Sequence, residues 1–598
     1  MIRALILLIT NLTRLMWSVM RKLIRTLTAP LRKPKRRYVA LTIPKGIELS
    51  APPRKIGPLS LPSRGQGAWW QFEDALQKIA DDPEIEGVFF RAEQTAMGLA
   101  EVGVIADRLN ELRKQGKRVI CHMNQAMLPD YLLATAADTI MMAPPGRLYT
   151  FGLRTEMMFL GEALEKVGIR AQFINLGRYK TASHRFTRER MSRSQMIMMS
   201  QILEGMATSI LGRVSERRDI PMEEARRLFD DAPMAARDAR RHKLIDRALY
   251  ADDIKDTIKD ETECDRPVTV VGQARYLAQL PRPFRWQPLR RRRAHVAVLN
   301  LSGIIMMGNE GLQGQLRKSL TPKGVVKALK QLREDDLVKA VVLHIDSPGG
   351  SALASDLMWR AIRKLAEEKP VIASLGNVAA SGGYYIAAAA HQIVAAEATI
   401  TGSIGVIAGK LSGGELVEKL GVHFDSISVG ETSSFASLTS AMSDTEVANL
   451  RRDIRAFYRR FLHRVSVGRN MDRRKVHRLA RGRVYTAPRA RTLGLVDVIG
   501  DLNTAIDLAC KEASVKRDDI NVAFVDHRQE ALQSMLGRSR QAPDLFSEAS
   551  RDDASTASSA WLAELLPEQL HPHVATALLM RQGAALTLWP YLEGPVRA

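Results

Sequence analysis

Residues 339–376 of the chain are KAVVLHIDSPGGSALASDLMWRAIRKLAEEKPVIASLG. The two short apolar runs in this stretch, AVVLHI and PVIASL, are typical of strands that are buried on both faces. The segment between them, SALASDLMWRAIRKLAEE, is amphipathic at helical spacing and predicts a helix that begins near Ser351. A strand, a helix and a second strand in series favour parallel pairing of the two strands. The stretch therefore predicts an α/β fold with a parallel sheet.

Other segments of the chain show that this unit is present twice. Three pairs match: EGVFFRAE (86–93) with KAVVLHID (339–346), DYLLATAAD (130–138) with GYYIAAAAH (383–391), and KVGIRAQFINLGRYK (166–180) with KLGVHFDSISVGETS (419–433). The members of every pair are 253 residues apart. A constant offset over nearly a hundred residues indicates an internal duplication.

The duplication and the composition between its halves predict the domain organisation. At 598 residues the chain is too long for one hydrophobic core. We expect a basic membrane-binding helix at 1–37, an N-terminal repeat at 38–275, a Pro/Arg-rich linker at 276–293, a C-terminal repeat at 294–511, and an extension at 512–598 that is partly disordered.

Charge and cysteine content narrow the class of protein. The net charge is +23, but ten basic residues and no acid fall within 1–37, and a second basic run covers 290–293. Such local charge favours anionic lipid over nucleic acid as a partner. The three cysteines, Cys121, Cys264 and Cys510, are scattered and odd in number, which argues against a disulfide framework or a Cys-x-x-Cys metal site. We expect no metal and no cofactor.

The N-terminal segment has the pattern of a helix that lies on a membrane. Residues 2–27 are mostly apolar, and at about 100° per residue their polar side chains fall in one sector. The pattern predicts an interfacial amphipathic helix with a basic face. The expected lipid-contacting residues are Arg3, Arg14, Trp17, Arg21 and Arg25.

Other interpretations of this segment remain open. A single spanning helix is the nearest rival, and an organelle transit peptide also fits an Arg-rich start without acids. A secretory signal is less favoured because no small-residue cleavage pattern follows. We therefore expect a protein of the cell (inner) membrane, peripheral or single-pass, with the side of the membrane undetermined.

Two glycine-rich loops in the C-terminal repeat are candidates for chemistry. The first is DSPGGS (346–351), where backbone N–H groups at a helix start could hold an oxyanion, although a plain strand-to-helix turn fits equally well. The second is NVAASGGY (377–384), in which Ser381 opens a small-residue helix and is well placed as a nucleophile. None of the twelve histidines accompanies these loops as a motif. A buried lysine can replace histidine as the base, because desolvation lowers its pKa.

Five segments together resemble the motifs of the signal peptide peptidase A (SppA) family in its long, duplicated form. They are DSPGGS, AASGGYY, TGSIGV, GRYKTASHRFTRERMS and GRVYTAPRARTLGLVD, and the resemblance covers roughly residues 38–511. It implies that Ser381 is the nucleophile and Lys180 the general base. It further implies that Ser403 orients the lysine and that three glycines support the oxyanion: Gly349, Gly350 and Gly382.

The resemblance also implies a fold and a biological role. The fold would consist of stacked β-β-α units like those of Clp protease and crotonase. The protein would assemble as a homotetramer on the membrane and hydrolyse signal-peptide remnants and other short hydrophobic peptides.

The duplication provides an internal check on these roles. At the offset of 253, Ser381 corresponds to Leu128, Lys180 to Ser433, and the SPGG sequence to QTAM at 94–97. The N-terminal repeat lacks the serine and the SPGG loop, and the C-terminal repeat lacks the lysine. This is expected if one site is built from residues of both repeats. Two alternatives remain, a membrane scaffold without activity and a crotonase-like acyl-CoA enzyme that would use a carboxylate instead.

Overall fold

The computed structural model describes most of both repeats. The described residues are 12–13, 15–16, 19–20, 36–49, 54–56, 59–61, 67–150, 152–254, 256–257, 268–280, 294–308 and 319–526. The chain divides into two compact units, one of residues 1–152 and 207–293 and the other of residues 153–206 and 294–598. Residues 153–206, which belong to the N-terminal repeat by sequence, therefore pack with the C-terminal repeat.

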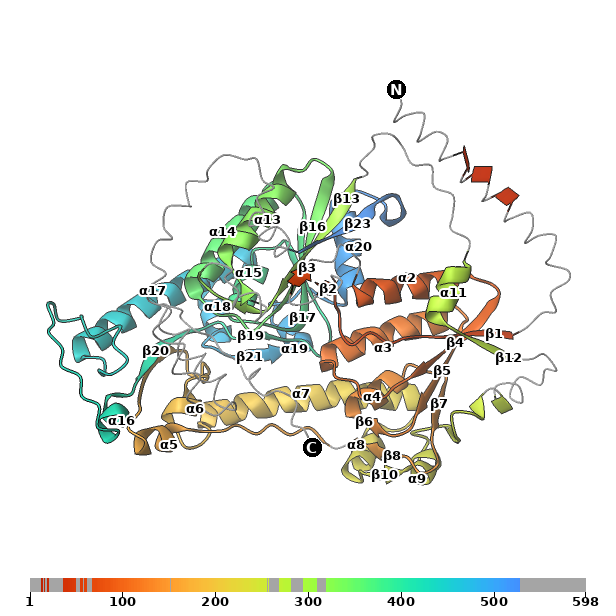
Figure 1. Cartoon of the computed structure of the whole chain (residues 1–598), viewed down its shortest axis with the longest axis horizontal. Helices are drawn as coiled ribbons and strands as arrows, with labels where there is room; N and C mark the ends of the chain where they lie inside the picture. The colour runs from red at the N-terminus through yellow and green to blue at the C-terminus, as the bar shows by residue number, and fades with distance from the viewer. Residues whose placement is uncertain are drawn as a thin grey trace. The chain divides into compact units, whose positions relative to one another are not determined.

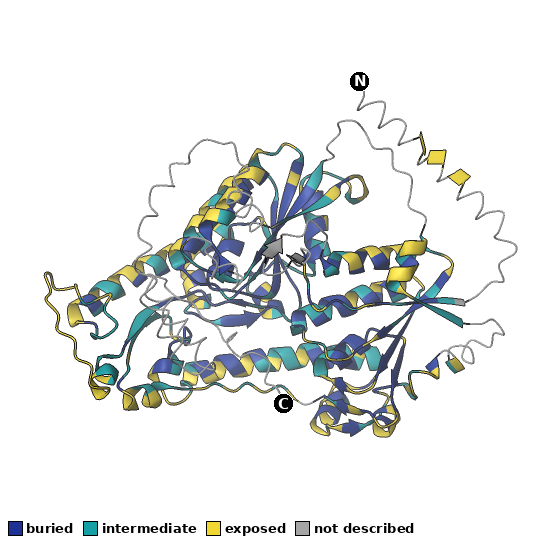
Figure 2. Cartoon of the chain, viewed as in Figure 1, coloured by how far each residue is buried: buried dark blue, intermediate teal, exposed yellow. Residues whose placement is uncertain are grey.

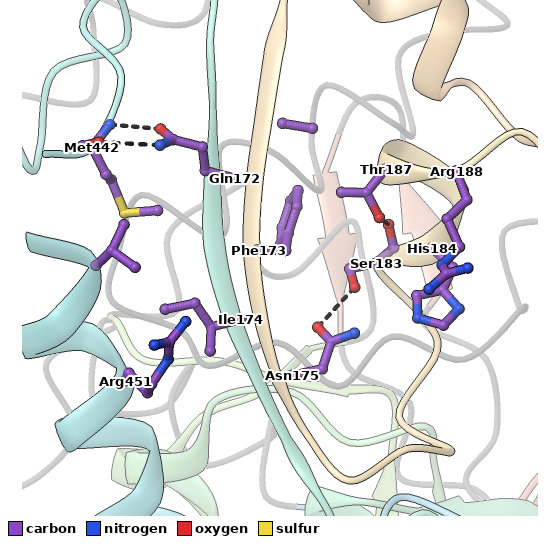
Figure 3. Close-up of a pocket in the computed structure, with 12 residues that line it drawn as sticks. Gln172, Phe173, Ile174, Asn175, Ser183, His184, Thr187, Arg188, Met442 and Arg451 are labelled. Carbon is purple, nitrogen blue, oxygen red and sulfur yellow. Dashed lines mark hydrogen bonds between the residues drawn. The ribbon is translucent and has the colours of Figure 1, made fainter. Parts of the chain in front are cut away.

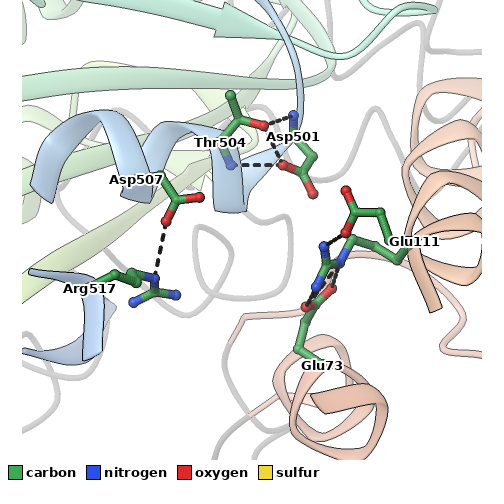
Figure 4. A network of polar contacts seen from close by, with 7 residues as sticks. Glu73, Glu111, Asp501, Thr504, Asp507 and Arg517 are labelled. Carbon is green, nitrogen blue, oxygen red and sulfur yellow. Dashed lines mark hydrogen bonds and ion pairs between the residues drawn. The ribbon is translucent and has the colours of Figure 1, made fainter. Parts of the chain in front are cut away.

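The first unit contains a six-stranded sheet in the order β11-β7-β5-β4-β1-β12. All of its neighbouring strands are parallel. Its strands are β1 (Arg36–Ala40), β4 (Ile85–Arg91), β5 (Arg118–Met123), β7 (Thr139–Met142), β11 (Arg247–Ala248) and β12 (Val268–Gly272). Helix α2 (Ala68–Asp81) and helix α3 (Leu99–Lys114) are linked by Arg108, whose guanidinium donates to Glu73 at 2.8 Å and also contacts Glu111 (Figure 4).

The second unit contains the sheet that the opening sequence stretch predicts. Its strand order is β21-β19-β17-β16-β13-β23, with β18 paired to β17 and β22 paired to β18. Only the β19–β21 pair is antiparallel within the described part of this sheet. The strands are β13 (His295–Ser302), β16 (Val338–Ser347), β17 (Val371–Ala380), β18 (Gln392–Ala395), β19 (Ile400–Gly402), β21 (Val484–Thr486), β22 (Val498–Ile499) and β23 (Asn521–Asp526). The predicted parallel α/β fold is confirmed.

Helices cover both faces of this sheet (Figure 1). Helix α14 (Ala352–Ala366) starts where the sequence predicts, because the Ser351 hydroxyl caps it by accepting from the Ala354 N–H at 3.3 Å. With α13 (Pro322–Glu334) it packs on one face, and alternate β16 residues such as Leu343 and Ile345 lie in that core. Helix α20 (Leu502–Glu512) contacts β16 and β17 and is capped by Asp501, which accepts from the Thr504 N–H at 2.8 Å (Figure 4).

The segment 153–206 of the second unit joins the two repeats through a β-ladder. It contains α5 (Gly161–Lys166), β9 (Arg170–Leu176), α6 (His184–Thr187) and the start of α7 (Arg193–Arg218). Strand β9 pairs antiparallel with β20 (Val406–Ser412) of the C-terminal repeat, with Leu176 opposite Val406 and Arg170 opposite Ser412. Helices α16 (Gly414–Lys419) and α17 (Asp444–Gly468) follow β20 along the chain.

The secondary structure repeats at the offset that the sequence shows. Strand β7 corresponds to β18, β8 (Arg147–Tyr149) to β19, and α5 to α16, each 253 residues apart at both ends. The duplication is therefore a duplication of structure as well as of sequence.

Most of the expected N-terminal helix lies outside the described residues, including Arg3, Arg14, Trp17, Arg21 and Arg25. The few residues described there are helical, and their apolar side chains are exposed: Leu12, Leu15, Met16, Val19 and Met20. Within the described part of the chain, no helix combines the length and the apolarity needed to cross a bilayer. Residues 281–293 of the expected linker and residues 527–598 of the expected extension also lie outside it.

Candidate active site

Ser381 lies at the turn between β17 and α15 (Gly382–Ala387), at the carboxyl end of a central strand. Its φ of 54° is in a region that serine rarely adopts and that costs about 1–3 kcal/mol. Two backbone hydrogen bonds hold it there: its N–H donates to the Gly402 carbonyl at 2.8 Å, and its carbonyl accepts from the Tyr385 N–H at 2.8 Å. Only 1% of the residue is exposed, so its hydroxyl lies in a largely water-free environment.

The side-chain amine of Lys180 contacts the hydroxyl of Ser381. Its Nζ is 3.0 Å from Ser381 Oγ, 2.8 Å from Ser403 Oγ and 3.0 Å from the Ser403 carbonyl oxygen. Lys180 is 3% exposed, and none of the described carboxylates forms an ion pair with it. Burial without a counter-charge lowers the pKa of Lys180 well below its usual value of 10.5.

Three oxygen atoms surround Lys180 Nζ, and a neutral amine, the form that burial favours, can form a hydrogen bond with each of them. A neutral amine has two N–H donors and one lone pair. The two donors are satisfied by the carbonyl and hydroxyl oxygens of Ser403, which leaves the lone pair to accept the hydroxyl proton of Ser381. Ser403 is itself fixed, because its N–H donates to the Arg483 carbonyl at 2.7 Å. This arrangement can remove a proton from Ser381.

A turn at 480–483 covers Lys180, and sequence reasoning assigned no role to it. Gly482 has φ +79°, and a Cβ at this position would come within 2.5 Å of the Lys180 Cβ. The Tyr179 N–H donates to the Arg481 carbonyl at 2.9 Å, which fastens the turn to the lysine segment. The sequence did contain a signal for this turn, because Gly482 is the first residue of the GRVYTAPRARTLGLVD motif. The close approach that requires a glycine appears only in the fold.

The glycines of the SPGG loop lie against the turn of Ser381. Gly349 and Gly350 have φ of 101° and 151°, which favour glycine. A Cβ on Gly382 would come within 3.2 Å of the Gly350 nitrogen, so the loop and the start of α15 are in contact. The Gly349 N–H donates to Ser347 Oγ at 3.2 Å. The structure thus brings the six residues expected at the catalytic site together in the second unit.

A separate cavity of about 640 Å³ lies beside the segment that follows Lys180 (Figure 3). It is lined by residues of β9, α6 and α17, and Ser183 donates to Asn175 Oδ1 at 2.8 Å on its wall. Lys180 and Ser381 are not among its lining residues. Within the described ranges, no three His, Cys, Asp or Glu side chains are grouped so that they could hold a metal ion.

Comparison with known proteins supports a common origin of both repeats with one family of enzymes. The profile of Peptidase family S49 matches residues 111–265 and 363–516. The chain is 31% identical over 452 residues to "Serine protease SPPA, chloroplastic" from Arabidopsis thaliana, covering 74% of this chain and 66% of that protein. It is 29% identical over 490 residues to "Protease 4" from Haemophilus influenzae, covering 78% and 77%. "Protease 4" from Salmonella typhi is 27% identical over 457 residues, covering 74% and 72%.

Proposed function

The chain belongs to peptidase family S49 and is a serine peptidase of the signal peptide peptidase type, and from this premise we propose that Ser381 and Lys180 are its catalytic pair. The observation that carries the proposal is the 3.0 Å contact between the Ser381 hydroxyl and an amine that is buried without a counter-charge. Burying a lysine in this way costs stability. An inactive scaffold gains nothing from that cost, and a crotonase-like acyl-CoA enzyme needs a carboxylate rather than this lysine.

In the acylation step, neutral Lys180 accepts the hydroxyl proton while Ser381 Oγ attacks the peptide carbonyl carbon. The carbonyl π electrons move to oxygen and form a tetrahedral oxyanion. We propose that backbone N–H groups of the loop containing Gly349 and Gly350 and of Gly382, which is in contact with that loop, stabilise the negative charge; the Gly349 N–H would exchange its contact with Ser347 Oγ for one with the oxyanion. The lysine ammonium then returns its proton to the leaving amine as the C–N bond breaks.

In the deacylation step, water takes the place of the amine. Lys180, neutral again, accepts a proton from the water as its oxygen attacks the acyl carbon. Collapse of the second tetrahedral intermediate breaks the bond to Ser381 Oγ, and the ammonium returns the proton to that oxygen. No cofactor is required, because a single amine serves as base and acid in turn.

The substrates that we propose are signal-peptide remnants and other short hydrophobic peptides. The names of the relatives, one a serine protease and two of them proteases, support peptide hydrolysis. The resemblance of the five site motifs to the signal peptide peptidase A family supports the peptide class. On the same resemblance we extend the proposal to stacked units like those of Clp protease and crotonase, and to a homotetramer.

A fluorophosphonate probe tests the proposed nucleophile directly. The activated oxygen of Ser381 is expected to attack phosphorus and displace fluoride, which leaves one probe group on the peptide that contains residue 381. Mass spectrometry of the digested protein locates the label. Labelling is expected to disappear in Lys180→Met, because the hydroxyl then has no base. A probe group found on a different serine would reject the assignment.

Ser403→Ala is expected to lower kcat by about 10–100-fold while leaving KM nearly unchanged. The Ser403 hydroxyl accepts one of the two N–H groups of Lys180, but the carbonyl of residue 403 would still accept the other. Ser403 is therefore a positioning residue, and its loss misorients the amine without removing it. Steady-state kinetics with a soluble hydrophobic peptide measures the effect. A loss as large as that of Ser381→Ala would show instead that Ser403 takes part in the proton transfer.

We further propose that residues 1–37 attach the protein to anionic lipid surfaces. The one-sided placement of basic residues in the sequence supports this proposal. A peptide of residues 1–37 is expected to bind phosphatidylglycerol vesicles with an affinity that falls as salt rises, and to bind phosphatidylcholine vesicles much less. Replacing Arg3, Arg14, Arg21 and Arg25 by Ser provides the matched control. If the full chain resists extraction from membranes by carbonate, a spanning anchor is the correct description.

A further inference from the structure

A cavity of about 950 Å³ lies within the first unit, where the strands β12, β1 and β4 end (Figure 1). These three strands are parallel neighbours, so their carboxyl ends meet at one edge of the sheet. The carboxyl edge of a parallel sheet is a common place for a ligand in α/β proteins. All lining residues belong to the first unit, and neither Ser381 nor Lys180 is among them.

The cavity occupies the place at which the other repeat has its oxyanion loop. The residues QTAM (94–97) correspond to the SPGG sequence at the offset of 253, and all four line the cavity. In the C-terminal repeat Gly350 forms a β-bridge with Ile305, and the Ile305 N–H donates to the Gly349 carbonyl at 2.9 Å. The loop there is in direct backbone contact with the segment that follows β13.

A carboxylate takes the place of this backbone contact in the N-terminal repeat. One oxygen of Glu101 accepts from the Ile47 N–H at 2.8 Å, and the other accepts from the Gly98 N–H at 3.2 Å. The Glu101 side chain therefore stands between the segment that follows β1 and the loop that follows β4. The Thr95 N–H donates to the buried carboxylate of Asp130 at 2.8 Å, which fixes this loop further. The walls of the cavity are thus held in place without a ligand.

The lining of the cavity carries an excess of positive charge. Three basic residues line it, Lys45, Arg91 and Arg275, and none of them forms an ion pair with any described residue. Glu93 is the only acidic residue of the lining, and its Oε1 accepts from the Asn124 N–H at 3.1 Å, at the turn after β5. An excess of positive charge in a cavity attracts an anion.

Gln273 adds a neutral hydrogen-bond donor to the same lining. It belongs to α11 (Gln273–Gln279), a largely exposed helix (Figure 2). Its Oε1 accepts from the Thr42 N–H at 2.8 Å, which fixes the orientation of the amide. No described residue accepts from its Nε2, so two N–H donors remain for a ligand. A carboxylate can accept from such an amide as well as from guanidinium groups.

Buried apolar side chains form another part of the lining. Leu133 is 0% exposed, Phe90 1% and Met97 8%. A small inorganic anion gains nothing from such a surface, whereas an apolar chain that ends in a carboxylate can bury its apolar part there. The volume is also in the range of about 300–1,000 Å³ that is usual for cavities that bind small organic ligands.

We propose that this cavity binds the carboxyl end of a short hydrophobic peptide, with the terminal carboxylate among Lys45, Arg91 and Arg275. The choice of a peptide rests on the proposed function, because hydrolysis at Ser381 releases an acyl fragment that ends in a new carboxylate. The N-terminal repeat, which lacks the nucleophile and the oxyanion loop, then serves as a binding site for products of the reaction.

Photoaffinity labelling of the full-length Ser381→Ala protein tests the proposal without hydrolysis. The probe is a leucine tripeptide with a free carboxyl end, in which the middle residue is photoleucine. Mass spectrometry of the digested protein locates the attached probe. Attachment is expected within residues 89–97 or 272–275, which line the cavity. Attachment in the second unit alone would overturn the proposal.

Two variants with the same change in net charge show whether the basic residues of the cavity hold the probe. The cavity variant replaces the three basic residues of the lining by Gln. The control variant replaces three exposed arginines of α9 (Ala236–Arg241) by Gln: Arg237, Arg240 and Arg241. Labelling of the first unit is expected to fall about tenfold or more in the cavity variant and to stay within about twofold in the control. Equal labelling of both variants would contradict the proposed role of these residues.

Competition with unlabelled compounds identifies the group that is recognised. The leucine tripeptide is expected to displace the probe from the first unit at a concentration about tenfold lower than its C-terminal amide requires. This difference should shrink as salt rises, because the three cations are exposed. Equal displacement by the amide would overturn recognition of the carboxylate. Stronger displacement by decanoate than by the tripeptide would assign the cavity to a fatty acid and overturn the peptide as its occupant.

Activity measurements separate this proposal from the proposed catalysis. With Ser381 present, the cavity variant is expected to hydrolyse a short soluble peptide at nearly the original rate, because it retains both residues of the catalytic pair. Labelling of the first unit in a chain that hydrolyses no peptide would support the cavity and contradict the proposed function. Hydrolysis without labelling of the first unit would support the proposed function and overturn the cavity.

Discussion

Ser381→Ala is expected to lower kcat/KM for a fluorogenic hydrophobic peptide by about 10⁴-fold or more, because the chain then has no oxygen to form the acyl intermediate. The residue is held in a strained conformation by two backbone hydrogen bonds, which alanine can also make. Removing the hydroxyl therefore takes away the chemistry and leaves the local backbone in place. The melting temperature should change by only a few degrees.

The matched control for this variant is Ser374→Ala. Ser374 is a buried serine of the same strand, β17, and is 3% exposed. Its loss should leave kcat/KM within a few-fold of the unmodified chain. Turnover by Ser381→Ala above one hundredth of the original rate would assign the nucleophile to another residue.

Lys180→Met is expected to remove activity to a similar extent and to abolish the pH dependence of what remains. The unmodified enzyme needs neutral Lys180, so its kcat/KM should fall about tenfold per pH unit once pH drops below the lowered pKa of this group. Methionine fills a similar volume without an amine. Lys180→Arg should be equally inactive, because guanidinium keeps its proton at all working pH values.

Lys180→Met is also expected to raise the stability of the folded chain at neutral pH. Because the pKa of Lys180 is lower in the folded chain than its usual 10.5, the unfolded chain binds a proton more readily. The free energy of unfolding is therefore reduced as pH falls below 10.5, and the reduction stops growing below the folded pKa. Lys180→Met removes this penalty and should melt at a higher temperature than the unmodified chain at neutral pH. A lower melting temperature at neutral pH, together with a proton-dependent limb in the remaining activity, would contradict the assignment.

The parts of the fold that were predictable have strong local signals. Apolar strands around DSPGGS and the helix beginning after Ser351 follow from patterns of a few residues each. Lys180 could be found as a partner of Ser381 only through the motif resemblance and the duplication, because 201 residues separate them in sequence. No pattern of a few neighbouring residues can indicate a contact between residues that are so far apart in sequence.

Other features depend on tertiary packing that no local pattern contains. The residues KVGIRAQFINLG and KLGVHFDSISVG match closely, yet 170–176 forms a strand and 423–429 does not. The difference arises because a strand needs a paired edge, and only the first segment has one. The need for glycine at 482 depends on the close approach of Lys180, which is far away in sequence.

Residues 153–206 pack within the second unit, together with the C-terminal repeat. This packing has a consequence for the synthesis of the chain on the ribosome. Lys180 emerges about 300 residues before Gly482, the residue that covers it. At about 5–20 residues per second, the two are separated by roughly 15–60 s. During that interval we expect the amine to be hydrated and to carry a proton, so that it cannot act as a base. We therefore expect proteolytic competence to arise only after the segment containing Gly482 has been synthesised and has packed against Lys180.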